Sequence, residues 1–201
     1  ELEAFSYSVS HDLRAPLRSI DGFSQAVLEE YGATLDATGQ DYLGRVRAAA
    51  QRMARLIDDM LGLARMARAE MNLGEVDLTA LAHAVLADLG QHDPGRVVKL
   101  DVAEGLRARG DERLLRVVLG NLLANAWKFT ANAAHARIEV GVAPADRGVA
   151  YYVRDNGAGF DMAHADKLFV PFQLLHATAD YPGAGIGLAT VQRIVRRHGG
   201  R

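Results

Sequence analysis

The sequence predicts an α+β fold, in which a helical hairpin that forms a dimeric four-helix bundle is followed by an α/β sandwich. Apolar residues recur at intervals of three and four over the first seventy positions, as they do along one side of an α-helix. Turn-forming residues at 32–39 divide this stretch into two helices. Beyond residue 77, alternating apolar segments typical of strands mix with helical ones, which favours a sheet with its helices on one face.

Each helix of the expected hairpin carries one apolar stripe. The stripe of the first helix consists of Leu2, Phe5, Val9, Pro16, Ile20, Phe23 and Val27. The stripe of the second helix consists of Leu43, Val46, Ala50, Met53, Ile57, Met60 and Ala64. Two helices alone leave part of these stripes uncovered, because only a third or fourth helix closes the remaining side. We therefore predict a homodimer through the hairpin.

The regular spacing ends near Met71, where we place a domain boundary. We predict the hairpin at 1–70, a linker at 71–76 and a second domain at 77–201. In the second domain, helical periodicity covers 78–89, 111–129 and 186–197, and strand-like alternation covers 97–102, 136–142 and 149–154. The chain starts within a helical pattern, which indicates a part of a longer protein.

The composition argues against several classes of function. With 23 basic and 25 acidic residues and a net charge of -2, the chain lacks the positive charge that nucleic-acid binding requires. The absence of cysteine rules out disulfides and thiolate metal sites and fits a cytoplasmic location. The seven histidines show no metal-ligand spacing. No apolar run approaches the roughly 20 residues that span a bilayer, so we expect no membrane contact by this segment.

Two glycine-rich turns lie in the second domain, at 155–160 and 183–188. Glycine lets backbone amides approach a phosphate group, because no side chain intervenes. The turn at Gly185 leads directly into a helical pattern, whose N-terminus favours anions. Together with the polar helical segment at 121–128, these turns predict a nucleotide pocket.

Asn121, Asn125 and Lys128 lie on one face of the expected helix, because they are four and three residues apart. An amide oxygen suits Mg²⁺, which keeps several waters and shares phosphate oxygens with few protein ligands. Lys128 adds positive charge beside those phosphates. The alternative is a helix surface bridged by amides, with a solvated lysine.

Asp155 ends an apolar strand shortly before Gly157. A buried carboxylate there needs a hydrogen-bonded partner, and the exocyclic amine of adenine is a suitable donor. Alternatively, Asp155 terminates the strand in a turn, as Asp-Asn-Gly sequences often do. Further along, Phe169 and Phe172 precede a polar, turn-rich stretch, like an aromatic latch at the base of a mobile lid. Core packing explains either phenylalanine equally well.

His11 is the candidate phosphate acceptor. Because a helix turns by roughly 200° over two residues, His11 points away from the stripe at Val9 and towards water. Asp12 lies roughly 100° further round, where its carboxylate can accept the imidazole proton as a general base. Pro16 removes one helical hydrogen bond, so we expect a bent or mobile backbone near Asp12. Arg14 either orients a phosphate or keeps the helix soluble. Alone, His11 is an ordinary surface histidine, but beside a nucleotide pocket it indicates phosphoryl transfer.

With these motifs the sequence resembles the sensor histidine kinases of two-component signalling, and residues 5–14 are similar to their bacteriophytochrome-like branch. Five family boxes occur in order: the phosphoacceptor box at His11, the asparagine box at 121–130, a glycine box at 155–160, the phenylalanine box at 169–172 and a second glycine box at 183–188. The resemblance implies a dimerisation and phosphotransfer bundle followed by a Bergerat-type ATP-binding domain, the fold of gyrase and heat-shock chaperone ATPases.

The resemblance also implies roles for single residues. His11 matches the autophosphorylated residue and Asp12 its acid/base partner. Asn125 matches the magnesium ligand, Lys128 a phosphate contact and Asp155 the adenine reader. The remaining pocket positions match Asn121, Gly157, Gly159, Gly183, Gly185, Gly187 and Leu188.

Three features depart from the family pattern. Many relatives have threonine or asparagine four residues after the histidine, to position a water that dephosphorylates the partner; this chain has Ala15, so we expect weak phosphatase activity. Relatives commonly have arginine soon after the second phenylalanine, whereas this chain has Leu174 there, so we expect slow turnover. Relatives continue past the position of Gly200 with final strands, so we expect the ATP-binding domain to lack them and to leave a sheet edge open.

The resulting prediction is a sensor histidine kinase core. It uses ATP and Mg²⁺ to autophosphorylate His11 and passes the phosphoryl group to an aspartate in the receiver domain of a response regulator. An upstream sensor domain is its further expected partner. One alternative is a catalytically degenerate dimeric signalling scaffold that binds nucleotide without transfer. Another is an ATPase of the gyrase or chaperone type, which leaves His11 and the hairpin without a purpose.

Overall fold

The computed structural model describes residues 2–66, 70–145, 148–174, 181, 183 and 185–201. Within the two long helices of the hairpin, the side chains of residues 2–12, 55 and 58–66 also lie outside the described part. The chain divides into two compact units, Glu1–Ala69 and Glu70–Arg201. The predicted order, a helical hairpin followed by a unit of mixed helix and sheet, is confirmed.

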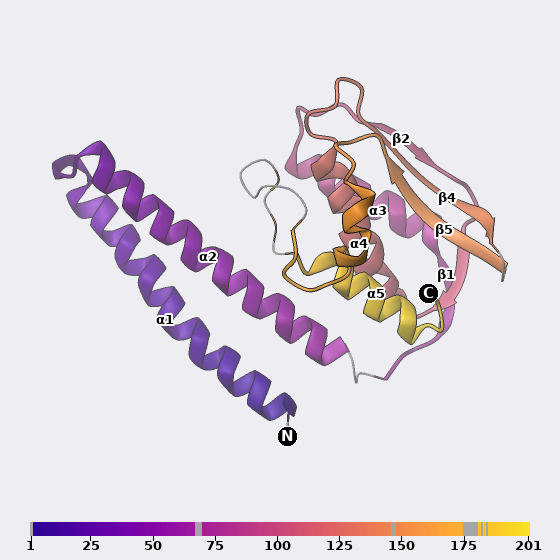
Figure 1. Cartoon of the computed structure of the whole chain (residues 1–201), viewed down its shortest axis with the longest axis horizontal. Coiled ribbons are helices and arrows are strands. Elements are labelled where there is room, and N and C mark those ends of the chain that lie inside the picture. The colour runs from indigo at the N-terminus through magenta and orange to yellow at the C-terminus, as the bar shows by residue number, and fades with distance from the viewer. Residues whose placement is uncertain (1, 67–69, 146–147, 175–180, 182, 184) are drawn as a thin grey trace. The chain divides into compact units, whose positions relative to one another are not determined.

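The first unit is the hairpin of α1 (Leu2–Tyr31) and α2 (Ala37–Met66), joined through a short 3₁₀ turn, η1 (Gly32–Thr34) (Figure 1). α1 runs through Pro16 as one helix. The Asp36 carboxylate accepts a hydrogen bond of 2.7 Å from the Gly39 amide and so caps the start of α2.

The two helices of the hairpin pack through part of the predicted stripe of α2 and through Leu17, which lies outside the predicted stripe of α1. Leu17 of α1 and Ala50 and Ile57 of α2 are buried together. Asp21 links the same faces by accepting from Arg47 Nε at 3.1 Å and from Gln51 Nε2 at 3.1 Å.

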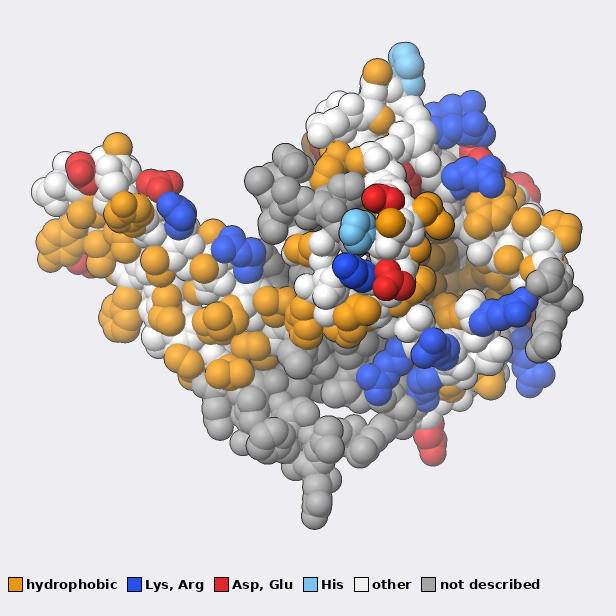
Figure 2. Space-filling model, viewed as in Figure 1, with side chains coloured by type: hydrophobic (Ala, Val, Ile, Leu, Met, Phe, Trp, Pro, Cys, Tyr) orange, Lys and Arg blue, Asp and Glu red, His pale blue; other side chains and the backbone are white. Residues whose placement is uncertain are grey.

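Most other described residues of the predicted stripes are exposed, although Leu43 is half-buried. Phe23 is 73% exposed and Met53 is 50% exposed, and Ile20, Val27 and Val46 are exposed as well. Hydrophobic side chains accordingly cover much of the hairpin surface in Figure 2. The hairpin therefore presents a second apolar face beyond the one that joins its helices.

The described residues of the second unit form two sheets. A three-stranded sheet has the order β2-β4-β5, with β2 parallel to β4 and β4 antiparallel to β5. A two-stranded antiparallel ribbon pairs β1 with β3. The strands are β1 (Gly74–Asp77), β2 (Lys99–Val102), β3 (Arg107–Gly110), β4 (Arg137–Ala145) and β5 (Gly148–Asp155).

Helices of the described residues lie on one face of the larger sheet (Figure 1). They are α3 (Leu78–His92), α4 (Glu112–Phe129) and α5 (Gly187–Arg197), and a further 3₁₀ turn, η2, spans Met162–Lys167. The sheet with helices on one face is the predicted architecture. Within the described residues, no helix is both long and apolar enough to cross a membrane.

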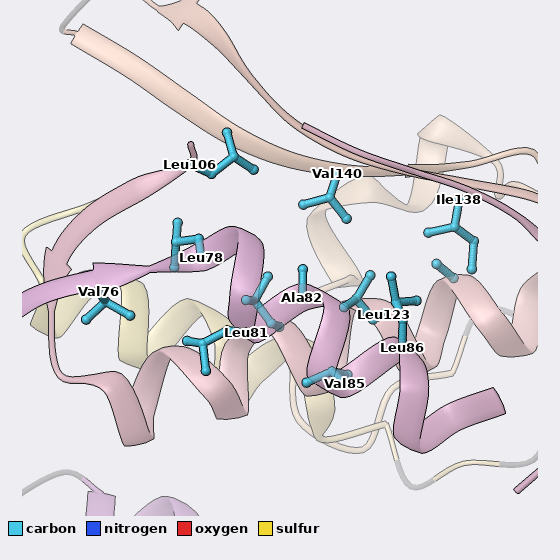
Figure 3. Packing of buried hydrophobic residues seen from close by; sticks show 12 residues of the cluster. Val76, Leu78, Leu81, Ala82, Val85, Leu86, Leu106, Leu123, Ile138 and Val140 are labelled. Atoms are coloured by element: carbon cyan, nitrogen blue, oxygen red, sulfur yellow. The ribbon is translucent and has the colours of Figure 1, made fainter. Parts of the chain in front are cut away.

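The core lies between the sheet and the helices α3 and α4 (Figure 3). Leu123 of α4 and Ile138 of β4 are 0% exposed at its centre. Leu119 and Ala126 bury the same face of α4 as Leu123 does. Because this apolar face points into the core, the rotation of α4 is fixed, and so is the direction of its polar face.

The ribbon of β1 and β3 was not predicted. β1 occupies part of the stretch expected to be a linker, and only Val76 of its four residues is buried. A strand of that length with one buried residue gives no alternating pattern to detect. Its partner lies far along the chain, because Gly74 pairs with Gly110 and Asp77 with Arg107.

Candidate functional site

The polar face of α4 carries the three residues that the sequence singled out on this helix. Asn121, Asn125 and Lys128 are all partly buried. Each lies on the side of α4 away from Leu123, which points into the core. The helix therefore presents two amides and one ammonium group along one partly enclosed face.

Asn121 meets the start of α5. Its Nδ2 donates a hydrogen bond of 2.8 Å to the Val117 carbonyl, which fixes the side-chain amide. A Cβ atom on Gly187 would lie 2.6 Å from Asn121 Oδ1. The first residue of α5 can therefore approach α4 this closely only because it is glycine. Leu188 follows in the same turn of α5 and is partly buried.

Lys128 lies at the other end of this face. Its Nζ is 4.2 Å from the centroid of the Phe129 ring, and a Cβ on Gly183 would lie 3.3 Å from the same nitrogen. Burial lowers the pKa of Lys128, because the charged ammonium loses solvation. An anion bound beside Lys128 would compensate for that lost solvation.

The first glycine turn is attached to the end of α4. The Ala158 amide donates a hydrogen bond of 3.1 Å to the Phe129 carbonyl oxygen. A Cβ on Gly157 would lie 2.6 Å from the Phe129 carbonyl carbon and closer still to its oxygen. Gly159 has a φ of 63°, in the left-handed region that favours glycine. Both glycines are thus required by backbone geometry.

Asp155 begins this turn, and its expected burial is wrong. The side chain is exposed, because it lies at the end of β5, an edge strand of the sheet. Its Oδ1 accepts a hydrogen bond of 2.9 Å from the Gly157 amide, which is the turn geometry that the sequence offered as the alternative. This contact holds the carboxylate at the mouth of the turn, exposed to a ligand.

Asn156 has a structural role that the sequence analysis did not identify. Its Oδ1 accepts from the Arg137 amide at 2.7 Å, and its Nδ2 donates to the His135 carbonyl at 2.8 Å. It thereby fastens the glycine turn to the start of β4. The signal was present in the Asp-Asn-Gly sequence, since asparagine in a turn often bonds to backbone groups.

The second glycine turn is attached to the phenylalanine segment. The Gly185 carbonyl accepts from the Phe172 amide at 2.9 Å. Gly185 has a φ of 71°, and a Cβ there would lie 2.8 Å from the Gln173 carbonyl oxygen. Phe172 itself has a φ of 67°, which is unusual for a side chain of this size. Phe172 and Phe169 are exposed, so core packing does not explain them.

Tyr181 is a second residue that the sequence analysis missed. Its ring lies 5.1 Å from the ring of Phe129, so an aromatic pair closes the end of α4. The expected lid also includes residues 175–180, 182 and 184, which lie outside the described part of the chain.

The structure thus brings together most of the predicted pocket residues of the second unit. The contacts run from Asn121 to Gly187, from Lys128 to Gly183 and from the end of α4 to Gly157. Asn125 lies one turn from Asn121 on the same face. His11 and Asp12 belong to α1 in the first unit, and their side chains lie outside the described residues.

Comparisons with known proteins agree with this arrangement. Residues 1–68 match the family described as "His Kinase A (phospho-acceptor) domain". Residues 110–201 match the family described as "Histidine kinase-, DNA gyrase B-, and HSP90-like ATPase". A phosphoacceptor domain therefore precedes an ATPase domain in this chain.

Relatives match the chain over its whole length. It is 35% identical to cyanobacterial phytochrome B of Nostoc sp., with 100% of this chain and 27% of the relative covered. It is 36% identical to the methanogenesis regulatory histidine kinase FilI of Methanothrix harundinacea, with 100% of this chain and 23% of the relative covered. The chain thus spans about a quarter of the length of these curated relatives.

Solved structures share the fold. Full-length ShkA, crystallised in complex with AMPPNP, superposes with a TM-score of 0.66 at 27% identity, covering 98% of this chain and 41% of that one. The histidine kinase AdeS of Acinetobacter baumannii has a TM-score of 0.56 at 20% identity, over 92% of this chain and 86% of that one, which is a likeness of fold. Since both domain families occur in order and the named relatives include a histidine kinase, the chain belongs to the sensor histidine kinases, a family of ATP-dependent protein kinases.

Proposed function

We propose that this chain is a histidine kinase core that binds Mg-ATP in the unit Glu70–Arg201 and transfers the γ-phosphoryl group to His11. The observation that carries the proposal is the close approach of both glycine turns to α4, at Gly157 and Gly187, with too little space for a Cβ at either. Backbone amides in such turns can approach phosphates directly. ShkA, which shares the fold, was crystallised in complex with AMPPNP, an ATP analogue, and this supports nucleotide binding by the present chain.

The residues present fit ATP and Mg²⁺. Lys128 supplies a partly desolvated cation for phosphate, and Asp155 supplies a held carboxylate that can accept from the adenine amine. The described residues contain no cluster of three or more histidine, cysteine or acidic side chains that could hold a metal alone. This suits Mg²⁺ ligated by the Asn125 amide oxygen, phosphate oxygens and water. When bound, Mg²⁺ would neutralise charge on the phosphates.

The chemistry of the proposal is one displacement at phosphorus. A ring nitrogen of His11 forms a bond to the γ-phosphorus while the bond to the bridging oxygen of ADP breaks. Asp12 accepts the hydrogen bond of the other ring nitrogen and stabilises the positive charge that develops on the imidazole. The phosphoryl group then passes to an aspartate in the receiver domain of a response regulator, and a sensor domain upstream controls the reaction.

The exposed apolar face of the hairpin supports a homodimer. Ile20, Phe23 and Val27 of α1 and Val46 and Met53 of α2 lie outside the buried contact between the two helices. A second copy of the same hairpin would cover these side chains in a four-helix bundle.

Incubation with γ-labelled ATP tests the proposal. We expect acid-labile label on the wild-type chain and none on His11→Gln, because glutamine has no nucleophilic imidazole. Nucleotide binding without label would favour the signalling scaffold, in line with Leu174 in place of a charged side chain. Phosphate release that does not depend on His11 would favour an ATPase.

We expect weak phosphatase activity, since Ala15 is exposed on α1 and has no side-chain group that could hold a water. Ala15→Thr is expected to speed the loss of label from a receiver domain that this chain has itself phosphorylated, by about tenfold or more. The matched control is Ala15→Val, which has the shape of threonine without the hydroxyl. Brisk dephosphorylation by the wild type, or equal rates for the two variants, would contradict this.

A further inference from the structure

Asp111 makes more contacts than a helix cap requires. It precedes α4, and its side chain is 2% exposed. Oδ1 accepts from the amides of Arg113 at 3.0 Å and Leu114 at 3.2 Å, which is ordinary capping of the first turn. The Arg113 guanidinium adds a contact of 3.0 Å to Oδ2.

The second carboxylate oxygen also holds the segment that enters this unit from the hairpin. Asp111 Oδ2 accepts a hydrogen bond of 2.9 Å from the Asn72 amide. Asn72 lies two residues before β1, which begins at Gly74. The chain is therefore fixed to the start of α4 before the first strand begins.

His198 holds Asp111 from the other side. The Asp111 amide donates to His198 Nε2 at 3.0 Å, and His198 Nδ1 lies 2.8 Å from the Ile194 carbonyl. An amide only donates and a carbonyl only accepts, so the ring is neutral with its proton on Nδ1. A Cβ on Gly110 would lie 2.8 Å from His198 Cδ2, so glycine there makes room for the ring.

We propose that Asp111 and His198 form a clamp that fixes the connecting segment at Asn72 to α4 and α5, the two helices beside the nucleotide site. By doing so, the clamp positions the bound nucleotide for phosphoryl transfer to His11. The inference rests on the proposed function. α4 carries Asn121 and α5 begins at Gly187, so a chain fixed to both helices moves together with the site.

The clamp would act through the effective concentration of the bound nucleotide at His11. Opening the clamp frees the chain from Asn72 to Gly74 and lengthens the connection by about 7 Å at full extension. A longer and less directed connection lowers the effective concentration of one tethered group at another. Both residues act by positioning, because neither is proposed to touch the nucleotide.

The test compares two substitutions of Asn72 in the full chain. Asn72→Pro removes the amide hydrogen that Asp111 holds, whereas Asn72→Ala keeps it. We expect both variants to bind ATP with the wild-type affinity. We expect Asn72→Ala to label His11 at the wild-type rate and Asn72→Pro to do so about fivefold more slowly.

His198 provides a rescue experiment. Glutamine can place an acceptor near the position of Nε2, whereas asparagine is too short to reach the Asp111 amide. We expect His198→Asn to slow labelling of His11 and to speed hydrogen exchange at the Asn72 amide, and His198→Gln to restore both. The fluorescence of Trp127, the sole tryptophan, reports whether each variant is folded.

Equal labelling by Asn72→Pro and Asn72→Ala would overturn the clamp, as would a loss of ATP affinity that accounts for the slower rate. If the wild type acquires no label at all, the proposed function fails, and hydrogen exchange at the Asn72 amide then tests whether the clamp exists. Rapid exchange of this amide in the wild type would then overturn it.

Discussion

Gly157→Ala is expected to weaken ATP binding about 100-fold and, with it, to reduce labelling of His11. The new Cβ would lie 2.6 Å from the Phe129 carbonyl carbon and 2.9 Å from Asp155 Oδ1. The first contact is with backbone, so the turn must move away from α4 and lose the hydrogen bond between Ala158 and Phe129. A loss of about 3 kcal/mol in binding corresponds to roughly a 100-fold weaker affinity, measurable by isothermal titration with ATP.

Gly120→Ala is the matched control for this substitution. Gly120 lies on α4 beside Asn121, and a Cβ there meets nothing within 4 Å. Alanine in a helix stabilises it by up to about 1 kcal/mol relative to glycine, so this variant should bind ATP as the wild type does. Wild-type affinity in a folded Gly157→Ala would show that the turn does not need its contact with Phe129.

The elements predicted correctly are those with strong local signals. α4 combines a capping aspartate with a long helical period, and both features are visible in the sequence. β1 and β3 were missed because, unlike β2, neither strand carries alternating apolar residues, and they pair with each other across the helix α3 and the strand β2. Pairing between distant short strands leaves no periodic pattern to detect.

The hairpin shows a different limit. The predicted stripe of α2 includes the buried Ile57, but α1 packs through Leu17, which was not predicted, and leaves the predicted Phe23 exposed. Spacings of three and four residues mark the apolar side of a helix without specifying which partner covers each residue.

The two glycine turns were predictable where backbone geometry demands glycine. Gly159 and Gly185 have positive φ, and such turns restrict the residue type strongly. The burial of Asp155 was predicted wrongly because β5 is apolar in sequence yet lies at the sheet edge, where Val149 is 60% exposed. The contribution of Tyr181 was not predictable, because its partner Phe129 lies far away along the chain.

Asp111→Ala is expected to lower the free energy of unfolding of the unit Glu70–Arg201 by about 2–4 kcal/mol. Alanine removes the cap of α4 and leaves the Asn72 amide without its acceptor. Asp111→Asn keeps one capping oxygen and should lower the free energy of unfolding by less than Asp111→Ala does. Urea unfolding followed by Trp127 fluorescence measures this unit alone, because the hairpin contains no tryptophan.

Asp111 also predicts how this stability depends on pH. The hydrogen bond from the Arg113 guanidinium, followed by that from the Asn72 amide, holds the pKa of Asp111 well below its ordinary range. A carboxyl whose pKa is lowered by folding contributes its full stabilisation above the unfolded pKa of about 3.9 and loses it as the pH falls towards the folded pKa. The difference in stability between the wild type and Asp111→Asn should therefore be constant from about pH 8 to 5 and shrink below about pH 4.

Arg113→Ala separates the two causes of this shift. The Arg113 side chain is 76% exposed, so its removal leaves the cap and the Asn72 contact in place. With its largest cause removed, the pKa of Asp111 rises towards the ordinary value, and the loss of stability in acid should begin at a higher pH. An acid transition identical to the wild type would mean that the backbone amides alone hold the carboxylate ionised, and that Arg113 is a solvated neighbour whose contribution is screened by water.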